Sequence, residues 1–165
     1  MDREELHSLV EELRRTPARL RELMAGLTPE TEIHRPRPDA FSARENVHHL
    51  RDIEAEGYGV RLLHMLGEPD PLLKDLDGAA LARERNYNAI PSGPALEEFA
   101  LLRAANVERL RRVGPEDLDR RGVWENVGPV TLGRILEMWR DHDREHLDEI
   151  ARLAGRLPAE PEHAG

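Results

Sequence analysis

Apolar residues return at helical spacing along most of this 165-residue chain, and this pattern limits its fold more than any other feature. Leucine, valine or another apolar residue recurs every three or four positions in four stretches, at residues 3–25, 43–66, 94–113 and 132–153. Such spacing gathers the apolar side chains on one face of a helix. The alternation typical of strands is not evident, and neither is an internal repeat. The sequence therefore predicts an all-α fold, an antiparallel four-helix bundle.

Residues that begin or interrupt helices refine these boundaries. Ser42 and Glu45 form a capping-box pattern at the start of the second helix, and Thr131 is a favourable N-cap for the fourth. Pro17 lies inside the first stretch, where a missing N–H and a ring clash predict a kink or a break near Thr16.

The connections between the predicted helices differ in length. Residues 28–40 are rich in proline, which excludes regular structure there. Residues 68–93 form a much longer connection, with a short helix predicted at 79–87. Residues 114–130 have room for a short extended segment around residues 123–124. The connections cannot all be short hairpins, so we expect a long crossover between the second and third helices.

The length of the chain fits one domain, which we assign to residues 1–157, and residues 158–165 form a polar tail that we predict to be disordered. The N-terminus has no positive segment ahead of an apolar run, and no stretch approaches the ~20 apolar residues of a membrane span. We expect a cytoplasmic protein that does not bind membranes.

Charge and cysteine content limit which partners the chain can bind and which atoms can hold a metal. The chain has 33 acidic and 24 basic residues and a formal net charge of −9, whereas nucleic-acid binding requires clustered positive charge. We therefore expect no nucleic-acid partner. Because the chain has no cysteine, any bound metal must be held by nitrogen and oxygen ligands.

Two histidines share one face of the predicted fourth helix. On a helical wheel His142 and His146 fall in the inward stripe, between Trp139 and Ile150. They could be core histidines satisfied by hydrogen bonds, or imidazoles that stay hydrated at the mouth of the bundle. A pair at this spacing also fits a shared cation, which would satisfy both rings at once. A metal site would need a third ligand.

The second predicted helix supplies the best third ligand. His49 falls on the same side as Ile53, Val60 and Leu63, whereas His48 is rotated away by about 100° but is not excluded. A further histidine on this helix lies roughly 22 Å from His49 at 1.5 Å per residue, too far to share an ion. The remaining histidines are less suited: His7, His34, His64 and His163. Three histidines from two helices would suit Zn²⁺ or Ni²⁺ and leave coordination positions open.

A competing motif overlaps the histidine pair. The sequence HDREH, residues 142–146, also matches the H-x-x-E-H pattern of inverted zinc peptidases, with Glu145 as the base. Those enzymes need another ligand well downstream and a large scaffold. Too few residues follow His146 to provide either, which disfavours this interpretation.

Two segments resemble the DinB-like (DinB/YfiT) superfamily of bacterial four-helix-bundle proteins. They are FSARENVHHLRDIE at residues 41–54 and GPVTLGRILEMWRDHDREHLDEI at residues 128–150. The resemblance implies one divalent ion, most often zinc or nickel, held by His49, His142 and His146, and frequently a homodimer. The chain departs from the commoner pattern at Phe41, where tryptophan is usual, and at Glu145, where a second histidine often precedes the last.

The same resemblance implies more than one function. Some members of this family resemble thiol S-transferases that use bacillithiol, mycothiol or glutathione, and one branch looks like metal-dependent hydrolases. We therefore expect an enzyme that activates a low-molecular-weight thiol or water for a small-molecule substrate. The alternative is a non-enzymatic module that binds a metal or small ligand for stability or sensing.

Several other side chains are candidates for supporting roles near such a site. Glu56 and Glu149 could accept a proton, although each also fits a solvated helix face, as Glu145 does. Asp52 and Glu54 could accept hydrogen bonds from imidazole N–H groups. The candidate pocket walls, which could equally be packing residues, are Tyr58, Tyr87 and Trp124.

Overall fold

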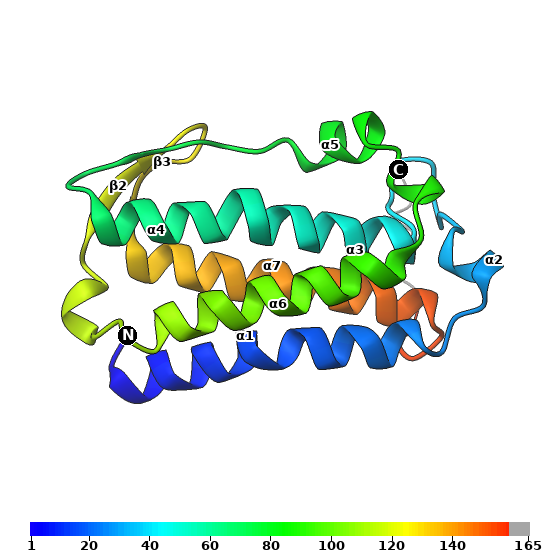
Figure 1. Cartoon of the computed structure of the whole chain (residues 1–165), viewed down its shortest axis with the longest axis horizontal. Helices are drawn as coiled ribbons and strands as arrows, with labels where there is room; N and C mark the ends of the chain where they lie inside the picture. Colours follow the sequence, from blue (N-terminus) through cyan, green and yellow to red (C-terminus); the bar gives the residue numbers. More distant parts are fainter. Residues whose placement is uncertain (159–165) are drawn as a thin grey trace.

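The computed structural model describes residues 1–158, and the predicted all-α four-helix bundle is confirmed (Figure 1). Each predicted long helix is present within a few residues of its expected ends. Their bounds are α1, Arg3–Met24; α3, Ala43–Asp52, which continues through a π-helical segment, η1, Ile53–Tyr58, into α4, Gly59–Gly67; α6, Ser92–Leu110; and α7, Leu132–Leu153. The predicted caps are also present, because Ser42 and Glu45 form a reciprocal capping box and Thr131 accepts from the Arg134 N–H.

The order of the helices around the bundle follows from the long crossover. Both α1 and α3 pack against α6 and α7. Helices α1 and α7 run in one direction, whereas α3–α4 and α6 run in the other (Figure 1). The second and third long helices are parallel because the crossover returns the chain along the whole length of the bundle, as Figure 1 shows. Each long helix therefore has one antiparallel and one parallel neighbour.

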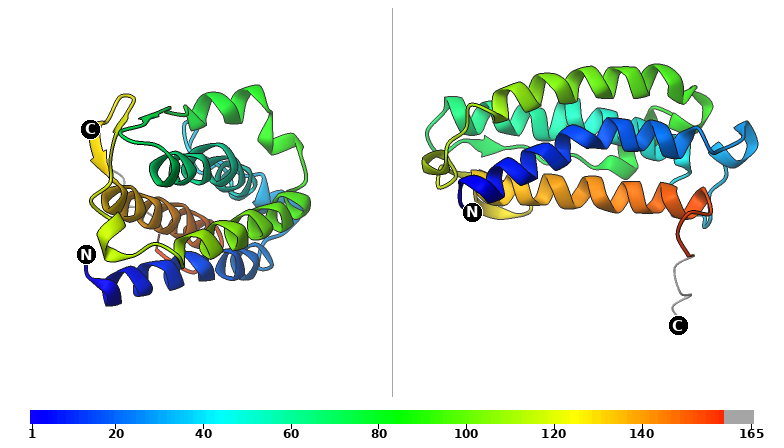
Figure 2. Two further views of the ribbon diagram at one scale, coloured as in Figure 1. Left: turned by 60° about the vertical axis from the view of Figure 1, so that its left-hand side comes forward. Right: turned by 90° about the horizontal axis from the view of Figure 1, so that it is seen from below.

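The crossover carries more regular structure than the sequence indicated. Its first residues form β1, Leu72–Leu73, which pairs in parallel with β2, Arg121–Trp124, and β2 pairs antiparallel with β3, Gly128–Thr131. Figure 2 shows this sheet at one end of the bundle. The sequence predicted only an extended segment at residues 123–124, since strands of two to four residues are too short to display a period.

Short helical turns complete the connections. The crossover continues into α5 and a 3-10 turn, in the region predicted to hold a short helix. The proline-rich connection also contains one turn of helix, which the sequence did not predict. The bounds of these short elements are α2, Pro29–Glu32; α5, Gly78–Glu84; η2, Tyr87–Ala89; and η3, Pro115–Asp117.

Helix α1 runs through Pro17 without the predicted break. Proline has no N–H, so the carbonyl of Leu13, four residues earlier, loses its helical partner. The buried guanidinium of Arg103 donates to that carbonyl at 2.8 Å. A side chain from another helix thus replaces the missing backbone hydrogen bond.

The π-helical segment corrects our assignment of faces on the second long helix. We predicted that Val60 and Leu63 share the buried face of His49, but they are 38% and 50% exposed. The N–H of Gly59 donates to the carbonyl of Glu54, five residues earlier, so the segment holds one extra residue. One extra residue turns everything after it by about 100°. Ile53 is buried as predicted, and the inward residues that follow it are Glu54, Tyr58, Leu62 and Met65.

The buried apolar side chains form two clusters along the bundle. One lies toward the sheet and includes Tyr58 and Trp139, and the other includes Leu50 and Ile150. Within the described part of the chain, no helix is both long enough and apolar enough to pass through a bilayer. The predicted tail lies, from residue 159 onward, outside the described residues.

Candidate metal centre

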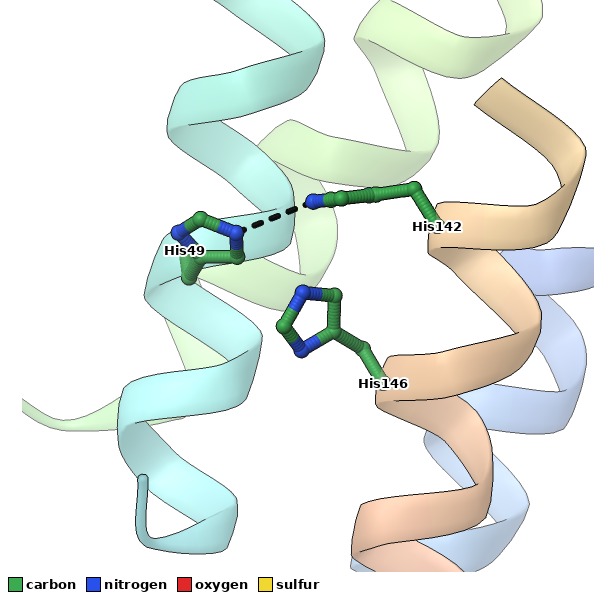
Figure 3. A group of neighbouring side chains, drawn as sticks. All are labelled: His49, His142 and His146. Atoms are coloured by element: carbon green, nitrogen blue, oxygen red, sulfur yellow. Dashed lines mark hydrogen bonds between the residues drawn. The ribbon is translucent and has the colours of Figure 1, made fainter. Parts of the chain in front are cut away.

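His49, His142 and His146 come together between α3 and α7 (Figure 3). One ring nitrogen of each lies within 4.8 Å of the other two. The Nε2 atoms of His49 and His142 are 3.0 Å apart, and a ring nitrogen of His146 points toward both (Figure 3). In residues 1–158 this is the one group of three or more side chains placed to hold a metal ion.

The local sequence explains this convergence. His142 and His146 are one turn apart on α7, and their ring centroids lie 4.4 Å apart. The capped start of α3 sets the direction of His49, whose ring centroid is 4.6 Å from that of His146. His49 and His146 are buried and His142 is partly buried. His49 lies on the face that helical spacing predicted, because it precedes the π-helical segment.

A hydrogen-bond chain fixes the tautomer of His146. The amide nitrogen of Asn46 donates to the Ser42 carbonyl at 3.0 Å, which leaves its Oδ1 to face the imidazole. The Nδ1 of His146, 2.6 Å from that oxygen, must therefore be the donor. The Nε2 lone pair of His146 is then free and directed at the other rings. Metal-binding histidines are oriented in this way by a partner on the second nitrogen.

The other two imidazoles lack such partners. The Nδ1 atoms of His49 and His142 are buried and form no hydrogen bond. Burial, with a smaller effect from His146, lowers the pKa of His49 to about 3. Burial and the neighbouring His146 and His49 also hold the pKa of His142 well below its ordinary value. The His49 and His142 rings are therefore compatible with the unprotonated form that a metal ligand requires.

The walls of the centre are aromatic side chains and one glycine. Phe41 lies 5.3 Å from the His49 ring, and Tyr58 meets His142 edge-on at 5.6 Å between centroids. Gly78, at the start of α5, presses its backbone against His49. A Cβ at Gly78 would lie 2.3 Å from Cε1 of His49, so a larger residue would displace the ring or the crossover.

The remaining histidines lie elsewhere. His48 turns away from the centre, where its Nε2 lies 3.0 Å from the Ile90 carbonyl and its ring stacks on Tyr87 at 5.3 Å. The structure thus answers the question left open between His48 and His49. His64 is partly exposed beside Glu68, His7 and His34 are exposed, and His163 is outside the described residues.

The predicted carboxylate partners of the imidazoles were assigned wrongly. Asp52 accepts hydrogen bonds from Tyr87 and Arg85, and Glu54 is bound by Arg103. Asp52 lies one turn beyond His48, on the side that faces the crossover. The π-helical segment directs Glu54 into the bundle. Neither carboxylate meets a ring of the centre.

Three other glutamates were uncertain from the sequence. Glu56 pairs with Arg85, and Glu145 is exposed, as expected of solvated helix faces. Glu149 is only partly exposed, and one of its oxygens lies 3.4 Å from the Nδ1 of His146. Burial acts to raise the pKa of Glu149, but hydrogen bonding and charge from His146 outweigh it and hold that pKa below its usual value.

Sequence reasoning missed two residues that shape the centre. Asn46 precedes His49 by three residues, and this helical spacing was the available signal. Gly78 lies in a long connection where nothing local indicated that its backbone would meet His49.

Comparison with known proteins supports the fold. Residues 12–150 match the model of the DinB superfamily. This match covers most of the chain, so the protein belongs to the DinB superfamily.

Individual relatives extend over nearly the full length of the chain. A proposed metal-dependent hydrolase of Oceanobacillus iheyensis, OB0782, is 24% identical over 92% of this chain and 87% of its own length. Another proposed metal-dependent hydrolase, of Bacillus licheniformis, is 28% identical over 94% of this chain and 89% of its own.

A solved structure has the same fold. YfiT from Bacillus subtilis is described as a probable metal-dependent hydrolase with an unusual four-helix bundle topology. It matches with a TM-score of 0.87 at 21% identity, over 94% of this chain and 89% of that one. At this level of identity the match establishes the fold.

Proposed function

We propose that this protein is a divalent-metal-dependent enzyme whose ion is held by His49, His142 and His146. The observation that carries the proposal is the convergence of three imidazole nitrogens within 4.8 Å, joined by no fourth protein ligand in residues 1–158. Sites with three protein ligands leave a position for substrate or water and are typical of catalytic zinc, whereas structural zinc sites are closed by four.

The donors indicate which cation to expect. Three imidazoles and no thiolate suit Zn²⁺ or Ni²⁺ better than Mg²⁺ or Ca²⁺, which prefer oxygen. A cation of this kind acts as a Lewis acid toward a carbonyl group and makes water or a thiol more acidic when bound. We expect one such ion per chain.

Residues of the chain itself prepare the site for this chemistry. Asn46 holds the His146 ring in the tautomer that presents its Nε2 to the centre. Phe41 and Tyr58 exclude water from the faces of the imidazoles. Glu149, whose carboxylate lies 3.4 Å from the Nδ1 of His146 and is ionised at neutral pH, is a candidate to accept a proton.

The names of the relatives support a reaction class for this proposal. Both relatives and YfiT carry names that point to metal-dependent hydrolysis, so we propose hydrolysis of a small molecule first. Transfer of a low-molecular-weight thiol such as bacillithiol, mycothiol or glutathione is the second reaction of this proposal. We further propose a cytoplasmic homodimer that binds neither nucleic acid nor membranes.

Metal content tests the ligand set. Protein purified without a metal-affinity tag should contain close to one divalent ion per chain by elemental analysis. His49→Ala should remove the ion, whereas His48→Ala, the adjacent buried histidine that faces Ile90, should retain it. Protein without an ion, or equal metal content in both variants, would contradict the assignment.

Activity screening then tests the chemistry. The zinc-loaded and nickel-loaded proteins should be assayed for hydrolysis of small esters and amides and for thiol transfer from bacillithiol, mycothiol and glutathione. We expect a metal-dependent turnover in one of these assays that His146→Ala abolishes. A turnover that survives in His146→Ala would show that the activity does not come from this centre.

A non-enzymatic metal-binding module is the alternative, and one observation favours it. The centre is enclosed, because His49 and His146 are buried and the backbone of Gly78 lies against His49. A bound ion that does not exchange water and supports no turnover in either assay would favour this alternative over an enzyme.

A further inference from the structure

A second buried polar cluster adjoins the histidines, and the proposed chemistry does not use it. The cluster consists of Arg103 on α6 with Glu54 on η1, Asp143 on α7 and Thr16 on α1, and we call it the Arg103 cluster. Its side chains are buried. Asp143 directly follows His142 in the chain, and Glu54 follows His49 by five residues.

Every donor of Arg103 is used. A guanidinium has five N–H groups in a rigid fork. Two of them bind Glu54 at 3.0 and 2.8 Å, two bind Asp143 at 2.5 and 3.1 Å, and the fifth reaches the Leu13 carbonyl at 2.8 Å. Both ion pairs are therefore bidentate, which fixes orientation as well as distance.

The two carboxylates are satisfied in turn. Glu54 also accepts from the Asn106 amide at 2.8 Å and from the Trp139 indole at 3.2 Å. Asp143 also accepts from the Thr16 hydroxyl at 2.7 Å. Four helical segments of the bundle thus meet at one side chain.

We propose that Arg103 is a positioning residue for the metal centre, which rests on the function proposed above. The helix that bears His49 and the helix that bears His142 and His146 make no covalent connection near the site. Their imidazoles meet only if the two helices keep one axial register and one rotation. The two bidentate ion pairs of Arg103 fix the axial register and the rotation, because each pair binds a carboxylate on one of the two ligand-bearing helices.

The π-helical segment fits this role. Glu54 lies in this segment and is buried inside the bundle, as is its neighbour Ile53. Gly59, where the segment ends, allows α6 to approach closely. A Cβ at Gly59 would lie 2.9 Å from the Asn106 amide nitrogen. The carboxylate that Arg103 binds on this helix thus comes from the π-helical segment itself.

Zinc affinity tests the positioning role directly. Arg103→Lys keeps the charge but has three donors and no fork, so we expect zinc binding about 10- to 100-fold weaker, as for other residues that support metal ligands. Affinity is measured by competition with a chromophoric chelator at a temperature where circular dichroism shows each variant folded. Leu110→Ala is the control, because it removes a buried side chain from the same helix, seven residues beyond Arg103, that has no group able to form a hydrogen bond with the cluster.

The comparison with Leu110→Ala separates positioning from general stability. We expect Leu110→Ala to lower the melting temperature and leave zinc affinity unchanged. Equal zinc affinities for the wild-type and Arg103→Lys proteins, or an equal loss in Leu110→Ala, would overturn the positioning role. If Arg103→Lys fails to fold, Asp143→Asn removes one of the two bidentate ion pairs and should show a weaker effect of the same kind.

A second measurement does not depend on metal binding. The chain has no cysteine, so Val60→Cys and Glu145→Cys place one spin label on each ligand-bearing helix. Both positions are exposed. In metal-free protein we expect one narrow distance distribution that Arg103→Lys broadens or shifts and Leu110→Ala does not. An unchanged distribution in Arg103→Lys would overturn the positioning role, whereas a wild-type protein that binds no zinc would refute only the proposed function.

Discussion

The Arg103 cluster and the histidine centre are adjacent buried polar groups that differ in how completely their atoms are paired. All five N–H donors of Arg103 bind oxygen atoms. In the histidine centre, by contrast, the Nδ1 atoms of His49 and His142 are buried without partners, and two Nε2 atoms face each other. Burial alone would lower the pKa of Arg103, but Asp143 and Glu54 outweigh it and raise that pKa. Burial of the histidines is not offset in this way.

This difference in pairing indicates that the Arg103 cluster supports the fold, whereas the histidine centre is suited to bind a ligand. A buried polar group without a partner costs free energy, so it persists only where something else requires it. A fully paired cluster fixes the arrangement of helices, whereas an incompletely paired set of nitrogens is suited to bind a ligand. We therefore expect the two clusters to respond in opposite ways to substitution, metal and pH.

Removal of Arg103 should have the largest effect. Arg103→Met leaves Glu54 and Asp143 buried together without a counter-ion, which typically costs about 3–5 kcal/mol. The loss should be visible in denaturant unfolding of the metal-free protein. Arg21→Met, which removes an exposed arginine paired with the exposed Glu97 on α6, is the control and should change stability by less than about 1 kcal/mol. Similar losses of stability in the two variants would mean that the buried ion pairs of Arg103 stabilise the fold no more than an exposed ion pair does.

Features that extend over several helical turns could be predicted from the sequence, whereas single insertions could not. The four long helices followed from the spacing of their apolar residues, because each period extends over several turns. The π-helical segment could not be foreseen, since one inserted residue leaves no signal in composition. It reversed the faces assigned to Val60 and Leu63 while leaving that of His49 correct.

The candidate site was predictable only in part for a related reason. His142 and His146 are four residues apart, so local geometry placed them together. His49 required the phase of a second helix and the family resemblance. Asn46 and Gly78 act through contacts between segments, and Arg103 cannot be distinguished in sequence from an arginine on a solvated face. Residues whose role depends on tertiary pairing carry little local signal.

Zinc should stabilise the protein through the histidine centre alone. Binding to the folded state adds about 2.7 kcal/mol at a free zinc concentration 100 times the dissociation constant. Thermal unfolding should therefore shift upward with zinc in the wild-type protein. The shift should disappear in His146→Ala and persist in His163→Ala, whose histidine lies outside the described residues. An undiminished shift in His146→Ala would place the bound zinc elsewhere.

Acid should weaken the metal-free protein through the same histidines. The pKa of His49 is about 3 in the folded protein, below its ordinary 6.5, so the unfolded chain takes up the proton first. The stabilising contribution of neutral His49 is present above pH 6.5 and is lost as the pH falls toward 3, by about 1 kcal/mol between pH 7.5 and 5.5.

Denaturant unfolding at the two pH values, with a chelator present, measures this loss. His49→Leu should reduce the dependence on pH, because it removes one of the depressed groups, whereas His163→Ala should not. An identical pH dependence in His49→Leu would show that the acid sensitivity arises elsewhere in the chain. The guanidinium of Arg103 stays charged across this range, since its pKa is raised.

Removal of the imidazole pair should have the smallest effect. The double variant His49→Leu with His142→Leu replaces two facing, incompletely paired rings by apolar groups, so stability of the metal-free protein should change by less than about 1 kcal/mol or increase slightly. Denaturant unfolding with a chelator present measures this change, and zinc should no longer stabilise the variant. A loss approaching that of Arg103→Met would mean that the imidazoles support the fold as the Arg103 cluster does. The unpaired nitrogens would then have a structural explanation, and the contrast between the two clusters would no longer indicate a ligand site.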